Sequence, residues 1–523
     1  VAPSFFAGPI GQLPECNCTR SAASRQAKIV LNPDGLGEST DGLETPMRFG
    51  KPAPFVSAFV AAVDEAIRAH QPHGGMSTIP QLWRAFCITA VLVTNAMCWA
   101  RFERASLGTY ALAALSWMCR HRKLPWDALL VASVRVILRY HGSTSGHLII
   151  DDTDNARSTA AKALAHLSKW RDKESGGYVW GPSLVFLVLV PPTISLPVGF
   201  VFSQPAPELS AWYQQAKGRK KQGVPPKQRP PKPTPNAQYP TKQHLALRLL
   251  AAFKAHHPAI RVHGIAADAL SGTGAFVDEA SALFEDGQVL SPIRSHQHLR
   301  VGQRQQPVAD SCAPHPGTPH TIRIRGGAER VAMVGSARVD VCAHKTKRCI
   351  VAITDAEEER YRSLIASDLS WRTLDIVQGH SLRWRVEVFM QDWKSYEGWS
   401  PLPKQPGEEG ACQSVILSLL VDHSLFLHPD QQAQLKNNRS AYTVGSLRAH
   451  VQAECLINVI DDLVAADNPQ DQLKRFTKAF HEVCAFGRSK KHMIQRQLGR
   501  LEPTPALRYR ADEVMRNMPV MST

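Results

Sequence analysis

Four side chains that could bind metal ions or phosphate groups lie close together in the sequence between His380 and Lys394. On a single helix of about 100° per residue, Arg383, Glu387 and Lys394 fall within about 40° of one another, and His380 falls within about 60° of Arg383. A carboxylate flanked by cations on one face can bind a metal ion while the cations hold phosphate groups. The simpler interpretation is a surface helix in which Arg383 pairs with Glu387, four residues later.

Two apolar runs with the pattern of buried strands lead into further carboxylates. Residues 148–150 lead into Asp151 and Asp152, and residues 260–267 lead into Asp268. Because successive strand side chains point to opposite faces, only one of the first two aspartates is expected beside the other carboxylates. For any single aspartate taken alone, a capping or turn role is the more ordinary expectation. The ordered set of three acids with the basic box favours catalysis.

The spacing around Glu387 resembles the signature of bacterial insertion-sequence DDE transposases of the IS-four group. That signature, Tyr-x2-Arg-x3-Glu-x6-Lys, is matched by Arg383, Glu387 and Lys394, while His380 stands in place of the tyrosine. The resemblance covers roughly Leu148 to Lys394 and is strongest at this third motif.

The first two acidic motifs of that group also have counterparts in the chain. Its closest members place the first catalytic aspartate directly before Thr, which selects Asp152 because Thr153 follows. Some related groups have Asp-x-Thr, which selects Asp151 instead. The strand and turn around Asp268 resemble the second motif. We therefore favour Asp152 and keep Asp151 as the alternative.

What the resemblance implies is phosphoryl transfer on DNA by two Mg²⁺ ions, or Mn²⁺ in their place. The metal ligands and catalytic residues would be Asp152, Asp268 and Glu387. The phosphate-binding side chains would be His380, Arg383 and Lys394. The expected partners are double-stranded DNA, at the transposon ends and at the target, and a second copy of the chain. The expected location is the bacterial cytoplasm, at the nucleoid.

Two other functions share these features. A DNA-binding protein descended from a transposase would have the same fold and charge without catalysis. An RNase H-like nuclease would cut DNA without joining it. The presence of all three carboxylates argues against the first, and the sequence leaves the second open.

The elements that must position these residues form an α/β pattern. A strand hairpin, then helix, strand, helix, strand and helix, is the order of an RNase H-like domain with a β-rich insertion and helical regions at both ends. The predicted divisions are a leader at 1–46, a DNA-end-binding helical domain at 47–140, a catalytic domain at 141–405 and a helical, dimerising region at 406–523. Within the catalytic domain we expect an exposed basic, proline-rich loop at 217–241 and the β-rich insertion at about 289–353.

Composition agrees with a nucleic-acid partner. The 61 Lys and Arg residues exceed the 45 Asp and Glu residues, which gives a formal net charge of +16. This charge favours a polyanionic partner, either nucleic acid or an anionic membrane surface, and does not by itself choose between the two. The apolar stretch from 183 to 202 has the length of a membrane span. Pro191 and Pro192 interrupt it, and because proline breaks a helix, we expect a hairpin of strands 184–190 and 194–202 and no membrane segment.

Overall fold

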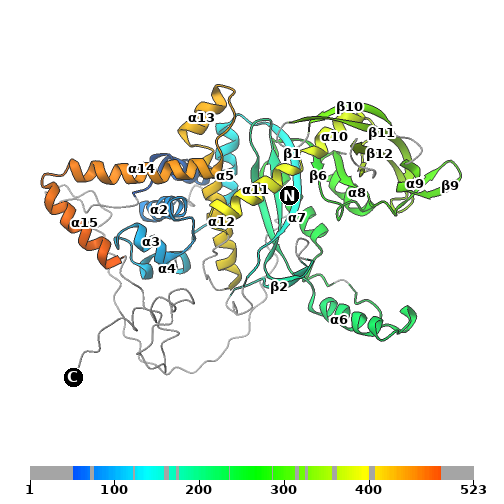
Figure 1. Ribbon diagram of the computed structural model, residues 1–523, viewed down its shortest axis with the longest axis horizontal. Helices are drawn as coiled ribbons and strands as arrows, with labels where there is room; N and C mark the ends of the chain where they lie inside the picture. Colours follow the sequence, from blue (N-terminus) through cyan, green and yellow to red (C-terminus); the bar gives the residue numbers. More distant parts are fainter. Residues whose placement is uncertain are drawn as a thin grey trace, which may run out of the picture. The chain divides into compact units, whose positions relative to one another are not determined.

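The computed structural model describes residues 51–483 except for short internal segments, and Figure 1 shows the arrangement of their helices and strands. The leader predicted at 1–46 and the last forty residues of the predicted region 406–523 lie outside this description. The internal segments left out are 71–75, 122–123, 158–163, 172–175, 235, 286, 313–316, 324–327, 356–361 and 400–406.

A mixed sheet of eleven strands carries the predicted acidic residues. Its first half has the order β5-β4-β1-β6-β7. Strand β1 pairs antiparallel with β4 and parallel with β6, β4 pairs antiparallel with β5, and β6 pairs parallel with β7. The five strands are β1 (Ser145–Asp154), β4 (Ser183–Val190), β5 (Leu196–Ser203), β6 (Arg261–Ala266) and β7 (Gln288–Pro292). The β4–β5 pair confirms the predicted hairpin.

The side chains of β1 alternate between two hydrophobic cores, one on each face of the sheet. Leu148 and Ile150 belong to the larger core, while Ile149 belongs to the other. The alternation continues along the strand. The side chain of Asp152 is therefore on the same face of the sheet as Leu148 and Ile150, and that of Asp151 is on the same face as Ile149.

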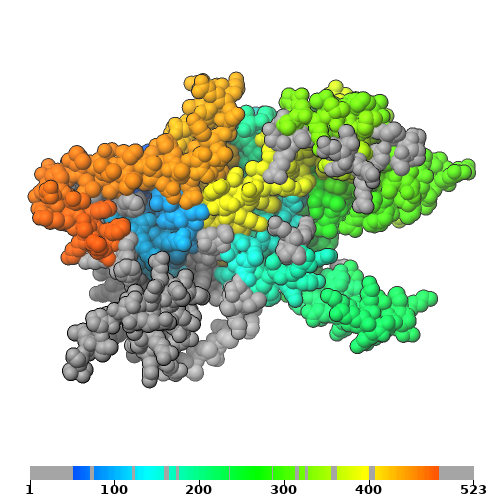
Figure 2. Space-filling view, in the orientation of Figure 1, coloured from blue at the N-terminus to red at the C-terminus, as the bar shows by residue number. Residues whose placement is uncertain are grey.

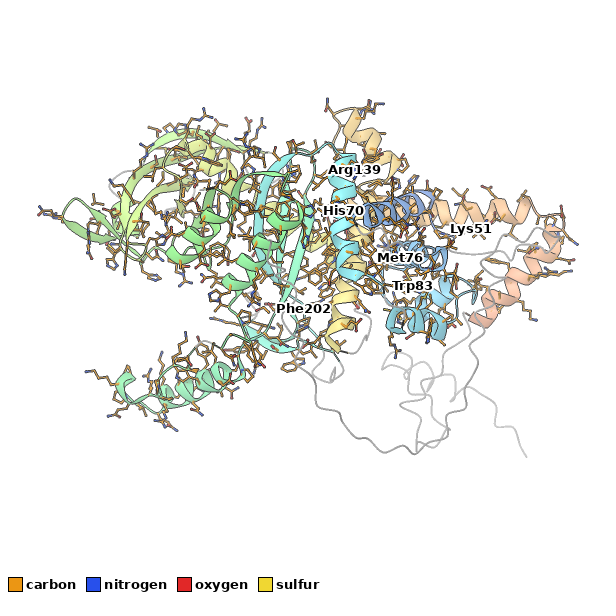
Figure 3. The ribbon with its side chains drawn as sticks, turned by 180° about the vertical axis from the view of Figure 1, so that it is seen from behind. Lys51, His70, Met76, Trp83, Arg139 and Phe202 are labelled. Atoms are coloured by element: carbon orange, nitrogen blue, oxygen red, sulfur yellow. The ribbon has the colours of Figure 1, made fainter. Side chains whose placement is uncertain are left out.

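Helices from before and after β1 cover the face with the larger core. Trp83 and Met76, labelled in Figure 3, are both buried in it. These helices share one core with the sheet, so residues 54–140 are packed as part of the same body. They are α1 (Pro54–His70), α2 (Thr78–Thr94), α3 (Trp99–Ala105), α4 (Leu112–His121), α5 (Trp126–Tyr140), α7 (Lys242–His256) and α8 (Gly274–Leu283).

The opposite face is covered by α10 (Thr373–Ser381) and α11 (Trp384–Tyr396). Residues 380–394, predicted as one helix, belong to two. Leu382 and Arg383 lie between the two helices, and Arg383 N–H bonds the His380 carbonyl at 3.0 Å, one residue short of the α-helical spacing. This tighter turn changes the helical phase. His380 therefore belongs to a different helix from Glu387 and Lys394.

The second half of the sheet contains the predicted β-rich insertion. Its order is β13-β12-β11-β8-β9, with β10 paired to β11. A third, smaller core that includes Leu299, Val341 and Ile350 lies within it. Its elements are β8 (His298–Val301), β9 (Arg304–Pro307), α9 (Val308–Cys312), β10 (Thr318–Arg323), β11 (Glu329–Val341), β12 (Thr346–Asp355) and β13 (Arg362–Ala366).

The basic, proline-rich tract is partly helical. Residues 217–221 form the end of α6 (Pro207–Lys221), which buries none of its residues, and a short 3-10 turn follows at Pro226–Gln228. A separate two-stranded sheet is formed by β2 (Ser168–Arg171) and β3 (Tyr178–Gly181).

Four helices form the described part of the C-terminal region: α12 (Gly407–Leu425), α13 (Pro429–Lys436), α14 (Val444–Val464) and α15 (Pro469–Val483). Helix α12 contributes residues to both large cores, which explains why it is buried on nearly all sides. Helices α14 and α15, orange in Figure 2, form part of the visible surface.

Among the described residues no single helix is long and apolar enough to cross a bilayer, although two sharply bent helix pairs, α2 with α3 and α12 with α13, reach that composition together.

Candidate active site

Three aspartates meet where β1 and β6 end. Asp151 and Asp152 are in the last part of β1, and Asp268 follows β6 by two residues. Because β1 and β6 are parallel neighbours, their carboxyl ends meet at one edge of the sheet. Each aspartate offers one carboxylate oxygen, and these oxygens lie within 4.8 Å of one another.

The structure brings both neighbouring aspartates to Asp268, whereas strand alternation predicts only one there. The alternation is still visible in their other partners. Asp151 accepts a bond from Arg383 Nη1 at 2.7 Å, and Arg383 precedes α11 on one face. Asp152 pairs with Lys242 of α7, on the other face. The two carboxylates therefore have different partners, although both lie near the end of β1.

Local hydrogen bonds fix the turn at Asp268. Its Oδ1 accepts bonds from the Leu270 N–H at 3.1 Å and from the Ser271 hydroxyl at 3.4 Å. Its carbonyl accepts a 2.7 Å bond from the hydroxyl of Ser291 on β7. A carboxylate that caps its own turn in this way has a defined position. This capping is compatible with metal binding because a carboxylate has several acceptor sites.

Glu387 lies outside the three-aspartate cluster and reaches it through Arg383. Arg383 Nη2 bonds Glu387 Oε1 at 2.5 Å while its Nη1 bonds Asp151. The Glu387 side chain is 44% exposed, against 13% for Asp151. One guanidinium therefore bridges Glu387 and Asp151, the alternative first acid of the predicted set. The i,i+4 pairing expected of an ordinary helix is present, but it is part of a wider network.

The predicted basic residues have different surroundings. Lys394 Nζ donates to the Asp154 carbonyl at 2.9 Å, so α11 contacts the end of β1 at a second point. Burial lowers the pKa of Lys394. His380 lies on α10, its Nε2 is buried without a hydrogen-bond partner among the described residues, and burial lowers its pKa to about 4. The predicted contact of His380 with a phosphate stays a prediction.

Burial and neighbouring acids shape the charge of the cluster. Burial raises the pKa of Asp151 to about 6, with further upward contributions from Asp152 and Asp268, while Arg383 acts in the opposite direction. Carboxylates crowded at one point resist simultaneous ionisation unless a cation is present. The cluster therefore favours a bound positive charge, which Arg383 and Lys242 supply in this structure.

Lys242 and Trp170 were not predicted as site residues. Lys242 pairs with Asp152, and its Nζ lies 4.8 Å from the centroid of the Trp170 ring. Trp170, on β2, donates its indole N–H to the Gly181 carbonyl at 3.0 Å. Lys242 opens α7 directly after the proline-rich tract, and nothing in its sequence neighbourhood indicates a partner ninety residues earlier.

Comparisons with known proteins give structural similarity without a sequence match. No protein-family model matches the chain, and no curated protein matches its sequence. A cryo-EM structure of a piggyBac transposase synaptic complex with hairpin DNA is similar over 83% of this chain and 84% of that chain, with 10% sequence identity and a TM-score of 0.40. The functional argument therefore rests on the residues and geometry of the site.

Proposed function

We propose that the chain is a DDE-type DNA transposase that cleaves transposon ends and transfers the cut strand into target DNA. The observation that carries the proposal is the meeting of Asp151, Asp152 and Asp268 within 4.8 Å at the ends of two parallel strands. Arg383 links Glu387 to the same site. The spacing of Arg383, Glu387 and Lys394, which resembles the transposase signature, supports strand transfer on DNA as the reaction of these carboxylates.

We assign the catalytic domain to the RNase H-like class. Strand β1, the β4–β5 hairpin, α7, β6, α8, β7 and the α10–α11 pair follow one another in the order expected of such a domain. The β-rich segment between β7 and α10 has the place of the family's insertion. This order supports the class and places the acidic residues at neighbouring strand ends.

We propose Asp151, Asp268 and Glu387 as the essential acids, which reverses the sequence preference for Asp152. Asp151 lies on the α11 face and shares Arg383 with Glu387. Asp152 is held on the α7 face by Lys242. The Asp-x-Thr pattern of related groups agrees with this choice. Asp152 then serves as a neighbour that tunes the charge of the site.

The donor set fits Mg²⁺ or Mn²⁺. Carboxylate oxygens are the ligands these ions prefer. Burial raises the pKa of Asp151, and the neighbouring carboxylates of Asp152 and Asp268 act in the same direction, so a bound cation would favour the charged cluster. Asp151 and Asp268 would hold the ions, with Glu387 as a third ligand and Asp152 beside them. When bound, such ions activate an attacking hydroxyl and stabilise the leaving oxygen of the phosphodiester.

The basic residues would orient the DNA. Arg383 pairs with both Asp151 and Glu387 in the structure, and once their charge is balanced by bound cations its guanidinium would be free to hold a phosphate. Lys394 keeps α11 against the end of β1 through Asp154 and adds positive charge there. The net charge of +16 strengthens binding to the whole duplex. A second copy of the chain and the bacterial nucleoid remain the proposed partner and location.

A direct test incubates the purified chain with Mg²⁺ and DNA fragments that carry the candidate ends of the element. We expect cleaved ends and joined products, and we expect neither with Asp268→Asn. Cleavage without joining would assign a nuclease. Tight DNA binding with no product would assign a non-catalytic, transposase-derived protein.

A further inference from the structure

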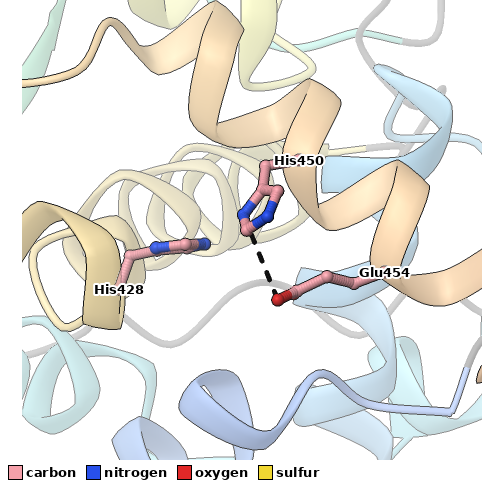
Figure 4. Close-up of side chains that lie close together, drawn as sticks. All are labelled: His428, His450 and Glu454. Atoms are coloured by element: carbon pink, nitrogen blue, oxygen red, sulfur yellow. Dashed lines mark ion pairs between the residues drawn. The ribbon is translucent and has the colours of Figure 1, made fainter.

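A second cluster of metal-binding side chains lies among the C-terminal helices. His428 precedes α13, while His450 and Glu454 are one turn apart on α14. Each offers one ligand atom, and these atoms lie within 4.8 Å of one another. Figure 4 shows the three side chains converging from the two helices. None of them contributes to the proposed nuclease site.

The buried member, His428, has a nitrogen with no assigned partner. Its residue is 1% exposed, and its ring lies 4.8 Å from that of Phe55 on α1. Its Nδ1 accepts the Asp430 N–H at 3.3 Å as the cap of α13, and its Nε2 is buried with no hydrogen-bond partner among the described residues. In the neutral ring, an accepting Nδ1 places the proton on Nε2. A buried N–H without an acceptor calls for an explanation.

The charges in this cluster, around His450, suit a divalent cation. Glu454 Oε1 lies 4.0 Å from His450 Nδ1, and Asp430 Oδ2 lies 3.1 Å from the same nitrogen. Two carboxylates beside two imidazoles can balance a doubly charged ion. The side chains of His450 and Glu454 are 48% and 44% exposed, so the cluster is open to solvent on one side.

We propose that His428, His450 and Glu454 form a zinc site, with Asp430 as a positioning residue that orients His450. Two imidazoles and a carboxylate are a ligand set that suits Zn²⁺, with water in the fourth position, whereas Mg²⁺ prefers oxygen ligands alone. A carboxylate bonded to a ligating histidine fixes the orientation of its ring. The site joins the start of α13 to the middle of α14.

The proton balance of this binding is defined. The ion takes the lone pair of His428 Nε2, and the proton from Nε2 moves to Nδ1. Nδ1 then gives up its long 3.3 Å bond from the Asp430 N–H. Burial lowers the pKa of His428, and the negative charge of Asp430 acts in the opposite direction, which favours the proton on the nitrogen nearer to Asp430.

The test measures zinc in the full chain, purified without a histidine tag. The background variant carries Asp151→Asn and Asp268→Asn, so that zinc held by the proposed nuclease site is removed from the count. After exposure to Zn²⁺ and desalting, mass spectrometry should find about one zinc per chain. Adding His450→Ala or Glu454→Gln should abolish this zinc. Adding Asp461→Asn, an exposed carboxylate on the same helix, should leave it unchanged.

Affinity and stability complete the test. Asp430→Asn should weaken zinc binding by roughly 10- to 100-fold in competition with a chromogenic chelator. Removing zinc should lower the melting temperature of the background variant and leave that of its His450→Ala derivative unchanged. Absence of zinc from the background variant, or its retention after both His450→Ala and Glu454→Gln, would overturn the proposal. The cluster would then be an ion-pair network around protonated His450. Both results are independent of DNA cleavage.

Discussion

Asp151 and Asp152 are adjacent in the sequence, yet each is held by a cation from a different face of the sheet. Arg383 holds Asp151 and also Glu387, whereas Lys242 holds Asp152. Of the two aspartates, Asp151 is therefore the better placed to share a metal ion with Glu387. Asp151→Asn and Asp152→Asn each remove one negative charge. A difference between their effects on cleavage therefore reports the position of the carboxylate and not the change in net charge.

We expect Asp151→Asn to reduce metal-dependent DNA cleavage by more than about 100-fold, beyond the roughly 10- to 100-fold effect of a residue that only orients a ligand. Asp152→Asn should fall within that smaller range because its direct partner is Lys242. Asp375→Asn, an exposed ion-paired aspartate on α10, is the control and should cleave normally. An inactive Asp152→Asn beside an active Asp151→Asn would restore the assignment that the sequence favours.

At the scale of elements, α11 has to begin and end at defined places to hold Glu387 beside β1. Its end is fixed by Gly398, which has φ of +77° and directly follows the C-cap residue Glu397. A Cβ at Gly398 would lie 2.7 Å from Met97 Cγ. This turn therefore requires glycine both for its backbone and for its space.

We expect Gly398→Ala to destabilise the chain by about 1–2 kcal/mol through its left-handed backbone and by about 1–3 kcal/mol more through overpacking against Met97. Gly142→Ala is the matched control, since Gly142 has φ of +58° and open space around its Cβ position. It should cost only the backbone part. Equal losses for both variants in urea unfolding would show that the contact with Met97 is relieved without cost.

The junction of α11 with α12 also contains a buried pair of acids. Burial and the nearby carboxylates raise the pKa of Glu397 well above its ordinary value. Burial raises the pKa of Asp422 on α12 from 3.8 to about 7. A raised carboxyl pKa means that the folded state holds the proton more tightly than the unfolded state. Its contribution is complete below the unfolded pKa and is lost as the pH rises through the folded pKa.

The melting temperature should therefore fall as the pH rises from about 4.5, near the ordinary carboxyl pKa, through about 7, where Asp422 titrates in the folded state. Asp392 adds negative charge near the pair and acts in the same direction. The double variant Glu397→Gln/Asp422→Asn should flatten this dependence because neither position titrates. His423 acts in the opposite direction over part of this range, because burial lowers its pKa from 6.5 to about 4. It is unchanged in the double variant, so the comparison of the two proteins cancels its effect. An equally steep fall in the double variant would place the titration elsewhere.

The sequence predicts the elements well where a local pattern determines them. The run Leu-Ile-Ile at 148–150 indicates β1, and the prolines at 191 and 192 indicate the turn between β4 and β5. The break at Leu382–Arg383 was missed because no proline or glycine occupies either position; tertiary packing of α10 and α11 overrides a continuous helical pattern.

Contacts between residues far apart in the sequence could not be predicted from local patterns. Lys242 meets Asp152 and Trp170 only because α7 and β2 lie next to the end of β1. The burial of His380 likewise depends on packing around α10. Charged residues at local spacings suggested chemistry, but their mutual distances are properties of the fold.

At the scale of the whole molecule, an excess of positive charge predicts DNA binding that weakens steeply with salt. In Ca²⁺, which should support binding with little cleavage, Arg383→Ala should reduce the magnitude of the salt slope by about one unit. Arg372→Ala is the control because Arg372 is exposed and pairs only locally with Asp375. Equal slopes for the wild type and both variants would remove Arg383 from the DNA-binding surface.

We infer that DNA is cut at the ends of β1 and β6, where the carboxylates of Asp151 and Asp268 would hold a metal ion. The most direct measurement is the Mn²⁺-dependent conversion of supercoiled plasmid into nicked and linear forms, which needs no knowledge of the transposon ends. We predict conversion by the wild type and by Asp375→Asn, and a loss of more than about 100-fold for Asp268→Asn. Asp268→Asn that folds normally and cuts at the wild-type rate would contradict the account.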